Sequence, residues 1–404
     1  MSEAGRDVTG PPNLALRVSM LYGAWAIVIG TQMAYLPVWL EWRGLSIAEI
    51  ALVASMPLAF RIVAMPVIAF LADRHNAHRS ILIVTAWVCL AAILLLAGMT
   101  GFWPILIVHL VATTALSPIL PLTETLAAAG ARSGALDYGR VRLWASVTFI
   151  LASLAGGALV SGVGPPAAVG LMAFGAVLTV LAAHGLPRPD RATSGTTGRR
   201  PLRWQDAVAL LRHPVIVLFL LAAGAVQSAH AVLYVFGTLH WQRLGHSTTM
   251  IGLLWSVGVL AEIALFAWSK AVSRYISPVG LILVGAAASV VRWAVMALDP
   301  PLGVLVPLQT LHALTYGASH LGAMQFIARA IPEPSSGTAQ ALYATVSGAV
   351  AMALVMQIAG YSYVAYAGLA YTAMVALAAV AGIAAWALRA RWSGGLLKAD
   401  AATA

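Results

Sequence analysis

The feature that most limits how this chain can fold is a series of long, almost uninterrupted apolar runs. An α-helix needs about 20 apolar residues to cross a hydrocarbon core of roughly 30 Å. Twelve runs of about that length can be placed, at residues 15–40, 46–72, 80–100, 102–126, 141–162, 165–186, 214–238, 248–270, 278–298, 301–328, 338–360 and 366–388. Because they are continuously apolar rather than alternating, they predict membrane-spanning helices and not the strands of a barrel.

The composition excludes an ordinary soluble protein. Hydrophobic residues make up 61% of the chain and charged residues 9%, and the mean hydropathy is +0.89. A soluble domain has about 25% charged residues, so this chain cannot cover a globular surface with polar groups. We therefore expect an all-α integral membrane protein whose surroundings are the lipid bilayer.

The net charge of +10 follows the predicted topology and does not require a nucleic-acid partner. With the twelve runs as spans, 19 of the 23 Lys and Arg residues fall on one side of the membrane, and the opposite loops carry only Arg43 and Arg243. Cytoplasmic loops are enriched in Lys and Arg. We therefore predict a cytoplasmic (inner) membrane protein with both termini in the cytoplasm.

One long polar segment, residues 186–214, separates six spans from six. It begins with a Pro-, Ser-, Thr- and Gly-rich stretch typical of a flexible linker. It ends with "WQDAVALLRH", where Trp204, Val208 and Leu211 share a helical face, as in a helix at the membrane surface. We predict an N-terminal six-helix bundle at 1–187, a cytoplasmic central loop at 188–213 and a C-terminal six-helix bundle at 214–404.

The loop after the second span carries a recognisable motif. The stretch "FLADRHNAHRS" resembles the Gly-x-Leu-Ala-Asp-Arg-x-Gly-Arg-Lys loop of the major facilitator superfamily, with Ala69 and Asn76 in place of its glycines. The resemblance implies a gating role for Asp73 and Arg74. A solvated pair of loop charges is the alternative explanation.

Further resemblance extends over nearly the whole chain. The segments "SPILPLTETLA", "DYGRVRLWASVTFI", "AHAVLYVFGTLHWQRLGHS", "GLLWSVGVLAEIALF" and "VVRWAVM" are similar to the 3-phenylpropionate permease branch of that superfamily, which is related to the lactose permease and nucleoside:proton symporters. The resemblance implies twelve transmembrane helices in two pseudo-symmetric six-helix bundles and proton-driven transport. It does not identify the substrate.

Two carboxylates lie deep inside the predicted spans. Of the 13 acidic residues, only Glu124 in "PLTET" and Glu262 in "VLAEIAL" are well inside apolar runs. Intramembrane acids are functional candidates because they are costly to hold there. Burial raises the pKa of a carboxyl group, so such a group can hold a proton when sealed and release it when wetted. We predict proton coupling at both positions, with a static hydrogen bond or ion pair as the alternative.

The surroundings of the first acid suggest a partner for it. Pro118 and Pro121 predict a kink just before Glu124, because proline removes a backbone donor. Glu124 is then within reach of two arginines at the start of the next span, Arg140 and Arg142.

Two arginines also lie inside spans, Arg61 in "LAFRIVA" and Arg292 in "VVRWAVM". A guanidinium does not readily lose its proton, so it must find an anion, carbonyl groups or water. Ion pairing with Glu124 or Glu262 is one explanation. The other is a carboxylate of the substrate, which guanidinium contacts through two hydrogen bonds.

The predicted spans 214–238 and 301–328 share the pattern Gln-x2-His-x3-Tyr. It places three side chains on one helical face in each span: Gln227, His230 and Tyr234 in the first, and Gln309, His312 and Tyr316 in the second. His320 continues the second stripe. In the superfamily's architecture both helices line the central cavity, so we predict substrate contact or proton transfer there. Interhelical hydrogen bonding is the alternative.

Three further residues are candidate cavity contacts. Gln32 and Tyr35 are polar residues of the first span, and Trp255 lies near the depth of the acids. An aromatic substrate could stack on Trp255, although ordinary packing is the favoured explanation. Interface anchoring or packing explains Gln32 and Tyr35 equally well.

These features together predict a secondary transporter rather than an enzyme. Our leading expectation is proton-coupled symport of a small aromatic carboxylate such as 3-phenylpropionate by alternating access, in a monomer. A sugar or nucleoside symporter or a drug exporter is the alternative. No nucleotide-binding or hydrolase motif is visible, which leaves a membrane-embedded enzyme or sensor remote. No cofactor and no metal site are expected.

Overall fold

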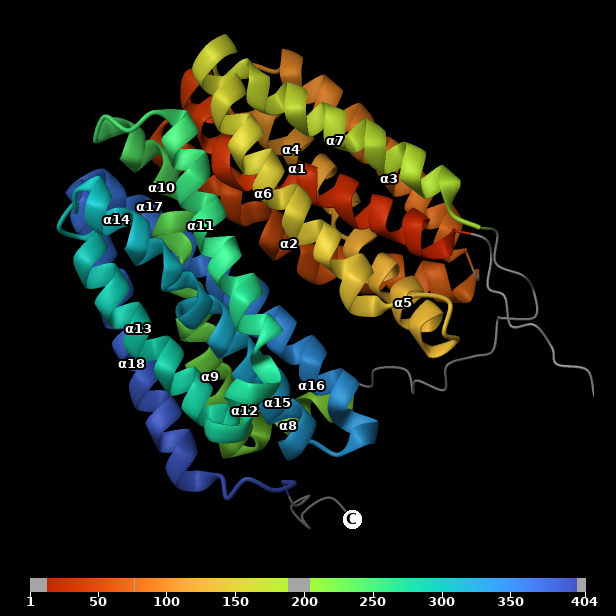
Figure 1. The fold of residues 1–404 in the computed structure, drawn as a ribbon, viewed down its shortest axis with the longest axis vertical. Helices are drawn as coiled ribbons and strands as arrows, with labels where there is room; N and C mark the ends of the chain where they lie inside the picture. Colours follow the sequence, from red (N-terminus) through yellow and green to blue (C-terminus); the bar gives the residue numbers. More distant parts are fainter. Residues whose placement is uncertain (1–12, 76, 188–203, 398–404) are drawn as a thin grey trace, which may run out of the picture. The chain divides into compact units, whose positions relative to one another are not determined.

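A computed structural model describes residues 13–75, 77–187 and 204–397 (Figure 1). Within these ranges the backbone forms helices joined by short turns, without a strand. Only the backbone is described for Ala69, Asp73, Trp204, Gln205, Asp206 and Pro334. The described part of the chain is therefore all-α, as predicted.

The first half of the chain forms seven helices. They are α1 (Leu14–Trp42), α2 (Ile47–Arg74), α3 (His78–Gly98), α4 (Phe102–Leu116), α5 (Ile119–Arg132), α6 (Tyr138–Val163) and α7 (Pro166–Gly185). The predicted kink before Glu124 falls at an interruption of the helix, where Ser117 and Pro118 separate the end of α4 from the start of α5.

The second half is more often interrupted. Its α-helices are α8 (Trp204–Arg212), α9 (Pro214–Ser228), α10 (Ala231–Arg243), α11 (Thr248–Ala267), α12 (Ser269–Tyr275), α13 (Pro278–Met296), α14 (Leu302–Thr310), α15 (Ser319–Ala330), α16 (Glu333–Thr345), α17 (Met352–Tyr366) and α18 (Tyr371–Arg391). Two π-helices, η2 (Ala313–Ala318) and η3 (Val346–Ala351), and one 3₁₀-helix, η4 (Ala367–Ala370), lie between them.

Ten helical stretches among the described residues are long and apolar enough to cross a membrane. One of them, Ser335–Arg391, contains two of the predicted spans, which meet near Ala367, a non-glycine residue at φ 49°. The predicted span 301–328 is formed by α14, η2 and α15 and is not among the ten. Counting that run as two and adding the interrupted segment accounts for the twelve predicted spans.

Several helix starts are fixed by capping groups that the sequence supplies. Before α2, Ser46 and Glu49 form a capping box: the Ser46 amide donates to Glu49 Oε2 at 2.8 Å, and the Glu49 amide faces Ser46 Oγ at 3.4 Å. Asp137 accepts the Arg140 amide at the start of α6, and Ser277 accepts the Gly280 amide at the start of α13. These caps satisfy amides that the helices themselves leave unpaired.

By their contacts the described residues form two compact units. Unit 1 holds residues 13–45, 60–187 apart from 76, and 247–253, whereas unit 2 holds residues 46–59, 204–246 and 254–397. The first half of α2 thus groups with unit 2 and the first turns of α11 with unit 1. The bundles 1–187 and 214–404 stay a prediction, and of the predicted loop at 188–213, residues 188–203 lie outside the described ones.

The two units repeat one scheme of helix neighbours. In unit 1, α1 packs on α6 and α7, and α3 packs on α4 and α7. In unit 2, α9 packs on η3 and α18, and α13 packs on α15 and α18. Counted by span within each half, the first span contacts the fifth and sixth and the third contacts the fourth and sixth, which is the internal repeat expected of transporters built from related bundles.

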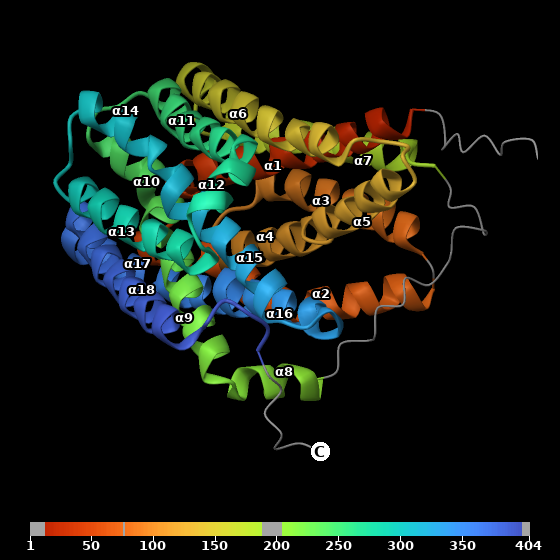
Figure 2. The same ribbon diagram turned by 60° about the horizontal axis from the view of Figure 1, so that its bottom comes forward.

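Short segments close one end of unit 2. Figure 2 shows α8 lying at an angle to α9, from which it is separated by His213. After α18 the chain turns back, so that the Leu397 amide donates to the Ala330 carbonyl and Trp392 meets Phe326 edge to face. The helix predicted in this region is present as α8.

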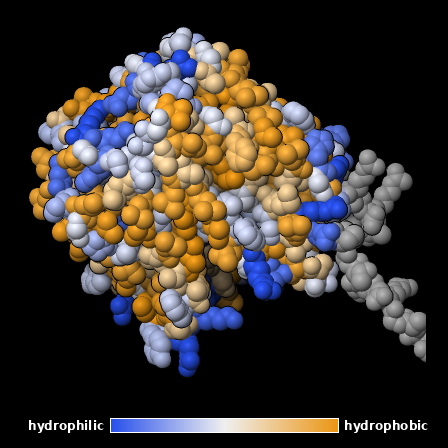
Figure 3. All heavy atoms as spheres, turned by 45° about the horizontal axis from the view of Figure 1, so that its top comes forward, coloured by the Kyte–Doolittle hydropathy of each residue, from blue (hydrophilic) through white to orange (hydrophobic). Residues whose placement is uncertain are grey.

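Hydrophobic side chains cover much of the surface seen in Figure 3. Large exposed apolar residues occur on several helices, among them Leu94, Trp103, Val163, Ile383 and Trp386. Soluble monomers rarely expose contiguous apolar patches above a few hundred Å². With the spans described above, this surface is that of a multi-pass membrane protein in contact with lipid.

Close helix packing in unit 2 leads to a first prediction. A Cβ added at Gly322 of α15 would lie 2.5 Å from the Pro278 carbonyl oxygen and 2.9 Å from Leu281 Cβ, whereas one added at Gly303 of α14 meets no atom within 4 Å. We expect Gly322→Ala to lower the free energy of unfolding by about 1–3 kcal/mol through overpacking. Gly303→Ala should leave it unchanged or raise it slightly, because alanine favours helix.

Thermal unfolding of both variants in detergent, against the unsubstituted protein, measures the difference. Equal melting temperatures for the two variants would contradict the close α13–α15 contact.

Candidate functional site

The span formed by α9 and α10 is broken at a histidine. The helix stops at Ser228 and restarts at Ala231, although neither proline nor glycine lies at the break. The ring nitrogen Nδ1 of His230 lies 3.2 Å from the Val226 carbonyl and 3.1 Å from the Gln227 carbonyl. A side chain that takes over helix carbonyls in this way interrupts the helical hydrogen-bond ladder, which explains the break.

The span formed by α14, η2 and α15 is broken by a different device. Pro307 lies inside α14, and the Thr310 hydroxyl donates to the Pro307 carbonyl at 2.7 Å. The helix then stops at Thr310 and resumes as the π-helix η2. A π-helix in a helical span often marks a functional segment. Here η2 carries Tyr316 of the second Gln-His-Tyr pattern, while Gln309 lies in α14 and His312 directly precedes η2.

Three glycines allow helices to approach one another closely in and beside η2. A Cβ on Gly258 of α11 would lie 3.3 Å from His312 Cβ, and one on Gly285 of α13 would lie 2.9 Å from Ser319 Cβ. A Cβ on Gly317, in η2 itself, would lie 3.4 Å from Glu262 Cγ. Small residues at helix contacts are the usual way to bring polar groups on membrane helices within bonding distance.

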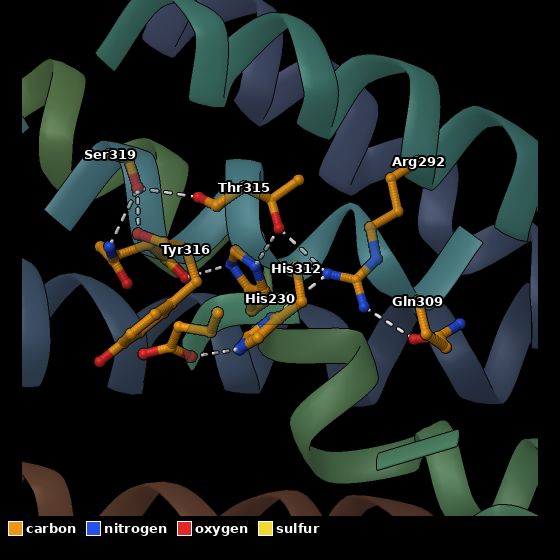
Figure 4. Close-up of polar contacts among 9 residues, drawn as sticks. His230, Arg292, Gln309, His312, Thr315, Tyr316 and Ser319 are labelled. Carbon is orange, nitrogen blue, oxygen red and sulfur yellow. Dashed lines mark hydrogen bonds and ion pairs between the residues drawn. The ribbon is translucent and has the colours of Figure 1, made fainter. Parts of the chain in front are cut away.

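The centre of this region is the guanidinium of Arg292 on α13, which is only 1% exposed (Figure 4). Its Nη2 donates to Gln309 Oε1 at 2.7 Å, and its Nη1 donates to Thr315 Oγ1 at 3.0 Å. The indole of Trp293 lies 4.8 Å from its carbon Cζ. These partners are all neutral, and within the described residues the guanidinium forms no direct ion pair with Glu262, contrary to one sequence prediction.

A histidine stands between the buried cation and the acid. His312 Nδ1 lies 3.4 Å from Arg292 Nη1, and His312 Nε2 lies 3.3 Å from Glu262 Oε2. Arginine nitrogens only donate hydrogen bonds, so Nδ1 must accept and the ring proton must be on Nε2. His312 is therefore neutral in this arrangement and donates to the Glu262 carboxylate.

The first Gln-His-Tyr pattern joins the same cluster through hydroxyl groups. His230 Nε2 lies 3.0 Å from Thr315 Oγ1, and Gln227 Nε2 donates to Ser319 Oγ at 3.2 Å. Because His230 Nδ1 donates to carbonyls, its Nε2 accepts from the Thr315 hydroxyl, which in turn accepts from Arg292. We use the name Arg292 cluster for these residues: Gln227, His230, Glu262, Arg292, Gln309, His312, Thr315 and Ser319.

Two ladders of aromatic rings flank the Arg292 cluster. Tyr234 stacks on His230 at 5.4 Å and faces Trp255 at 6.3 Å. In the other ladder Tyr316 stacks between His312 at 5.2 Å and His320 at 6.0 Å. The rings of His230 and His312 meet edge to face at 5.6 Å, so the ladders join at the two histidines.

A second acid–arginine cluster lies in unit 1. Glu124 Oε1 lies 3.2 Å from Arg142 Nε, and the Tyr138 hydroxyl donates to Glu124 Oε2 at 2.6 Å. The Arg142 guanidinium also lies over the ring of Tyr22, at 5.7 Å. The predicted reach of Glu124 to Arg142 is thus present, whereas Arg140 contributes its backbone amide to the Asp137 cap.

The remaining predicted residues are placed as follows. Tyr35 is fully buried in unit 1, where its hydroxyl donates to the Ser153 carbonyl at 2.6 Å and lies 3.4 Å from the Thr248 carbonyl, which makes it a packing contact. Gln32 is partly buried in α1, and Arg61 is exposed in α2 while its predicted partner Glu124 binds Arg142 instead.

The predicted gating pair lies at the end of α2. Arg74 is exposed and its guanidinium lies 5.8 Å from the ring of Phe70. The side chain of Asp73 lies outside the described part of the structure, so the gating role of Asp73 and Arg74 stays a prediction.

Sequence reasoning missed Thr315 and Ser319, the hydroxyls that join the two patterns. Both are polar residues of an apolar span at three and seven positions after His312, and this helical spacing was the available signal. For metals, the described residues contain no group of three or more His, Cys, Asp or Glu side chains placed to hold an ion.

The position of Thr315 leads to a second prediction. We expect Thr315→Val to lower the free energy of unfolding by about 1–3 kcal/mol, because it leaves His230 Nε2 and one Arg292 donor buried without their partner. Thr315→Ser keeps the hydroxyl and should retain most of the stability. Thermal unfolding of the two variants in detergent tests this, and equal losses would show that the methyl group and not the hydroxyl matters.

Comparison with known proteins shows what this chain is similar to. Residues 16–375 match the model of the MFS_1 like family. A protein of Escherichia coli (strain K12) described as "Probable 3-phenylpropionic acid transporter" is 31% identical over 336 residues, which are 83% of this chain and 87% of that protein. The maltose permease of Geobacillus stearothermophilus is 29% identical over 78% of this chain and 79% of its own length.

Solved structures agree on the fold. The crystal structure of the nucleoside transporter NupG superposes with a TM-score of 0.79 and 17% identity, over 94% of this chain and all of that one. At this identity the likeness supports the fold alone.

Proposed function

The chain belongs to the MFS_1 like family and is a membrane transporter of the major facilitator type, and from that premise we propose that it is a proton-coupled symporter of a small aromatic carboxylate. The observation that carries the proposal is the line Arg292–His312–Glu262 inside unit 2. It joins a buried cation to a partly exposed acid through one neutral ring.

The charges of this line link a proton to an anion. With Glu262 ionised, the line contains one positive and one negative charge and is neutral overall. When Glu262 binds a proton, the charge of Arg292 is left without compensation in a region of low dielectric constant, which is costly. A solute carboxylate that approaches the cluster relieves that cost, so proton and anion favour each other's binding.

The geometry also supports a change of structure on protonation. His312 Nε2 donates to Glu262 Oε2, and a hydrogen bond to an ionised carboxylate is roughly twice as strong as one to a neutral group. A proton on Glu262 therefore weakens the link between α11 and η2. Alternating access needs such a difference between states, because a ligand shifts a conformational equilibrium only through its differential affinity.

The aromatic ladders favour a solute that contains a flat ring. Tyr234, Tyr316 and His320 are partly exposed, and they extend on both sides of the two histidines. Offset stacking and edge-to-face contacts stabilise aromatic pairs by about 0.5–1.5 kcal/mol beyond area burial. The relative of E. coli, whose description names 3-phenylpropionic acid, is consistent with this choice.

The Glu124–Arg142 pair of unit 1 has a secondary role in the proposed transport. It is a direct acid–arginine ion pair that follows a helix break, and its two side chains are 31% and 39% exposed. We propose that it provides a second polar contact for solute or proton. We further propose an inner-membrane monomer with both termini in the cytoplasm, supported by the distribution of Lys and Arg.

The coupling role leads to a third prediction. In proteoliposomes with an imposed pH gradient, Glu262→Gln should abolish accumulation of labelled 3-phenylpropionate, because an amide cannot take up the proton. Exchange of labelled for unlabelled solute at equal pH should persist, since exchange requires no net movement of protons.

A matched control uses a carboxylate with a structural task. Glu49→Gln keeps an oxygen for the capping box before α2 and should leave both accumulation and exchange unchanged. Accumulation by Glu262→Gln at the level of the unsubstituted protein would rule out Glu262 as the coupling site.

The solute class leads to a fourth prediction. Thermal unfolding in detergent should shift upward with 3-phenylpropionate and much less with the corresponding amide, because the amide lacks the charge that compensates Arg292. Maltose and uridine represent the sugar and nucleoside alternatives. A shift with either of these and none with the acid would replace the proposed solute class.

A further inference from the structure

The indole of Trp255 on α11 is held by a hydrogen bond that the coupling proposal does not use. Its Nε1 donates to Thr238 Oγ1 at 3.0 Å. Thr238 lies on α10 and is 2% exposed, and Trp255 is 8% exposed. A buried indole N–H needs an acceptor, and Thr238 provides it among the described residues.

The same indole is also held by rings. Tyr234, one helical turn before Thr238, faces it at 6.3 Å with an angle of 27° between the planes. Trp241 meets it edge to face at 6.3 Å and 68°. The hydrogen bond and both ring contacts thus come from α10, so that two kinds of contact orient Trp255.

This arrangement determines what the ladder can offer to a solute. Because the N–H of Trp255 is already bonded inside the protein and its ring is buried, the indole has no hydrogen-bond donor to offer a solute. Tyr234 is partly exposed, whereas its neighbours His230 and Trp255 are buried. Tyr234 is therefore the ring of this ladder that a solute can reach, and Trp255 fixes its position from behind.

We propose that Thr238 is a positioning residue for recognition of the aromatic ring of the solute. Its hydroxyl orients the Trp255 indole, and the indole holds Tyr234 at the angle at which the solute ring packs against it. This inference rests on the proposed function, because it concerns how the same site distinguishes an aromatic from an aliphatic carboxylate.

The experiment uses two acids of similar shape. Uptake of labelled 3-phenylpropionate into proteoliposomes is inhibited by unlabelled 3-phenylpropionate or by 3-cyclohexylpropionate, and the ratio of the two inhibition constants measures aromatic preference. We expect Thr238→Val, which keeps the shape but removes the acceptor, to reduce this ratio about 2- to 10-fold, the range of one aromatic contact. The effect should appear in KM and not in the maximal rate.

Four further variants separate positioning from general damage. Thr238→Ser keeps the hydroxyl and should retain the ratio. Trp255→Phe keeps a ring but lacks the N–H, so it should lower the ratio, and adding Thr238→Val to it should have no further effect. Thr372→Val, at an exposed threonine whose hydroxyl bonds the Leu369 carbonyl of the preceding turn, is the matched control and should be silent.

The outcomes distinguish this inference from the function on which it rests. If the unsubstituted protein transports neither acid, the proposed function is wrong. If it prefers the aromatic acid and Thr238→Val keeps that preference, the positioning role is wrong. Should Thr238→Val fail to fold, Trp255→Phe alone decides, and an unchanged ratio in that variant overturns the inference.

Discussion

The structure of unit 2 depends on how a guanidinium is kept inside a membrane span. Arg292 is 1% exposed, and unpaired polar groups in an apolar interior cost several kcal/mol, so its two Nη groups are placed on acceptors. The acceptors come from one interrupted segment, α14 and η2, which supplies Gln309, His312 and Thr315. Glycines at three helix contacts let this segment approach its neighbours closely enough to do so.

Helix interruptions lie at or beside both polar clusters described above. The break at His230 and the break after Thr310 both lie within the Arg292 cluster, and the break at Pro118 precedes Glu124 in unit 1. An unbroken helix uses its carbonyls internally, whereas a broken one frees backbone groups and redirects side chains. Irregular backbone at membrane depth is tolerated only inside protein or beside a water-filled cavity, which fits a site for a polar solute.

The extent to which the sequence predicted the site differs from residue to residue. Local spacing was sufficient to place Gln227 and His230 on one face and to expect Arg142 beside Glu124. The direct pairing of Arg292 with an acid was wrong, because His312 stands between Arg292 and Glu262. The helix break at His230 could not be expected, since no proline or glycine marks it and a side chain causes it.

The sequence by itself determined that this is an all-helical membrane protein, because the cost of burying charge and exposing apolar surface is set by composition and can be counted along the chain. It also identified the few charged residues that such a protein must have a reason to keep. Only the tertiary structure decided which groups those charges meet and that a neutral histidine joins cation to acid. Hydrogen-bond partners depend on the distances between helices distant in sequence, and no local pattern contains those distances.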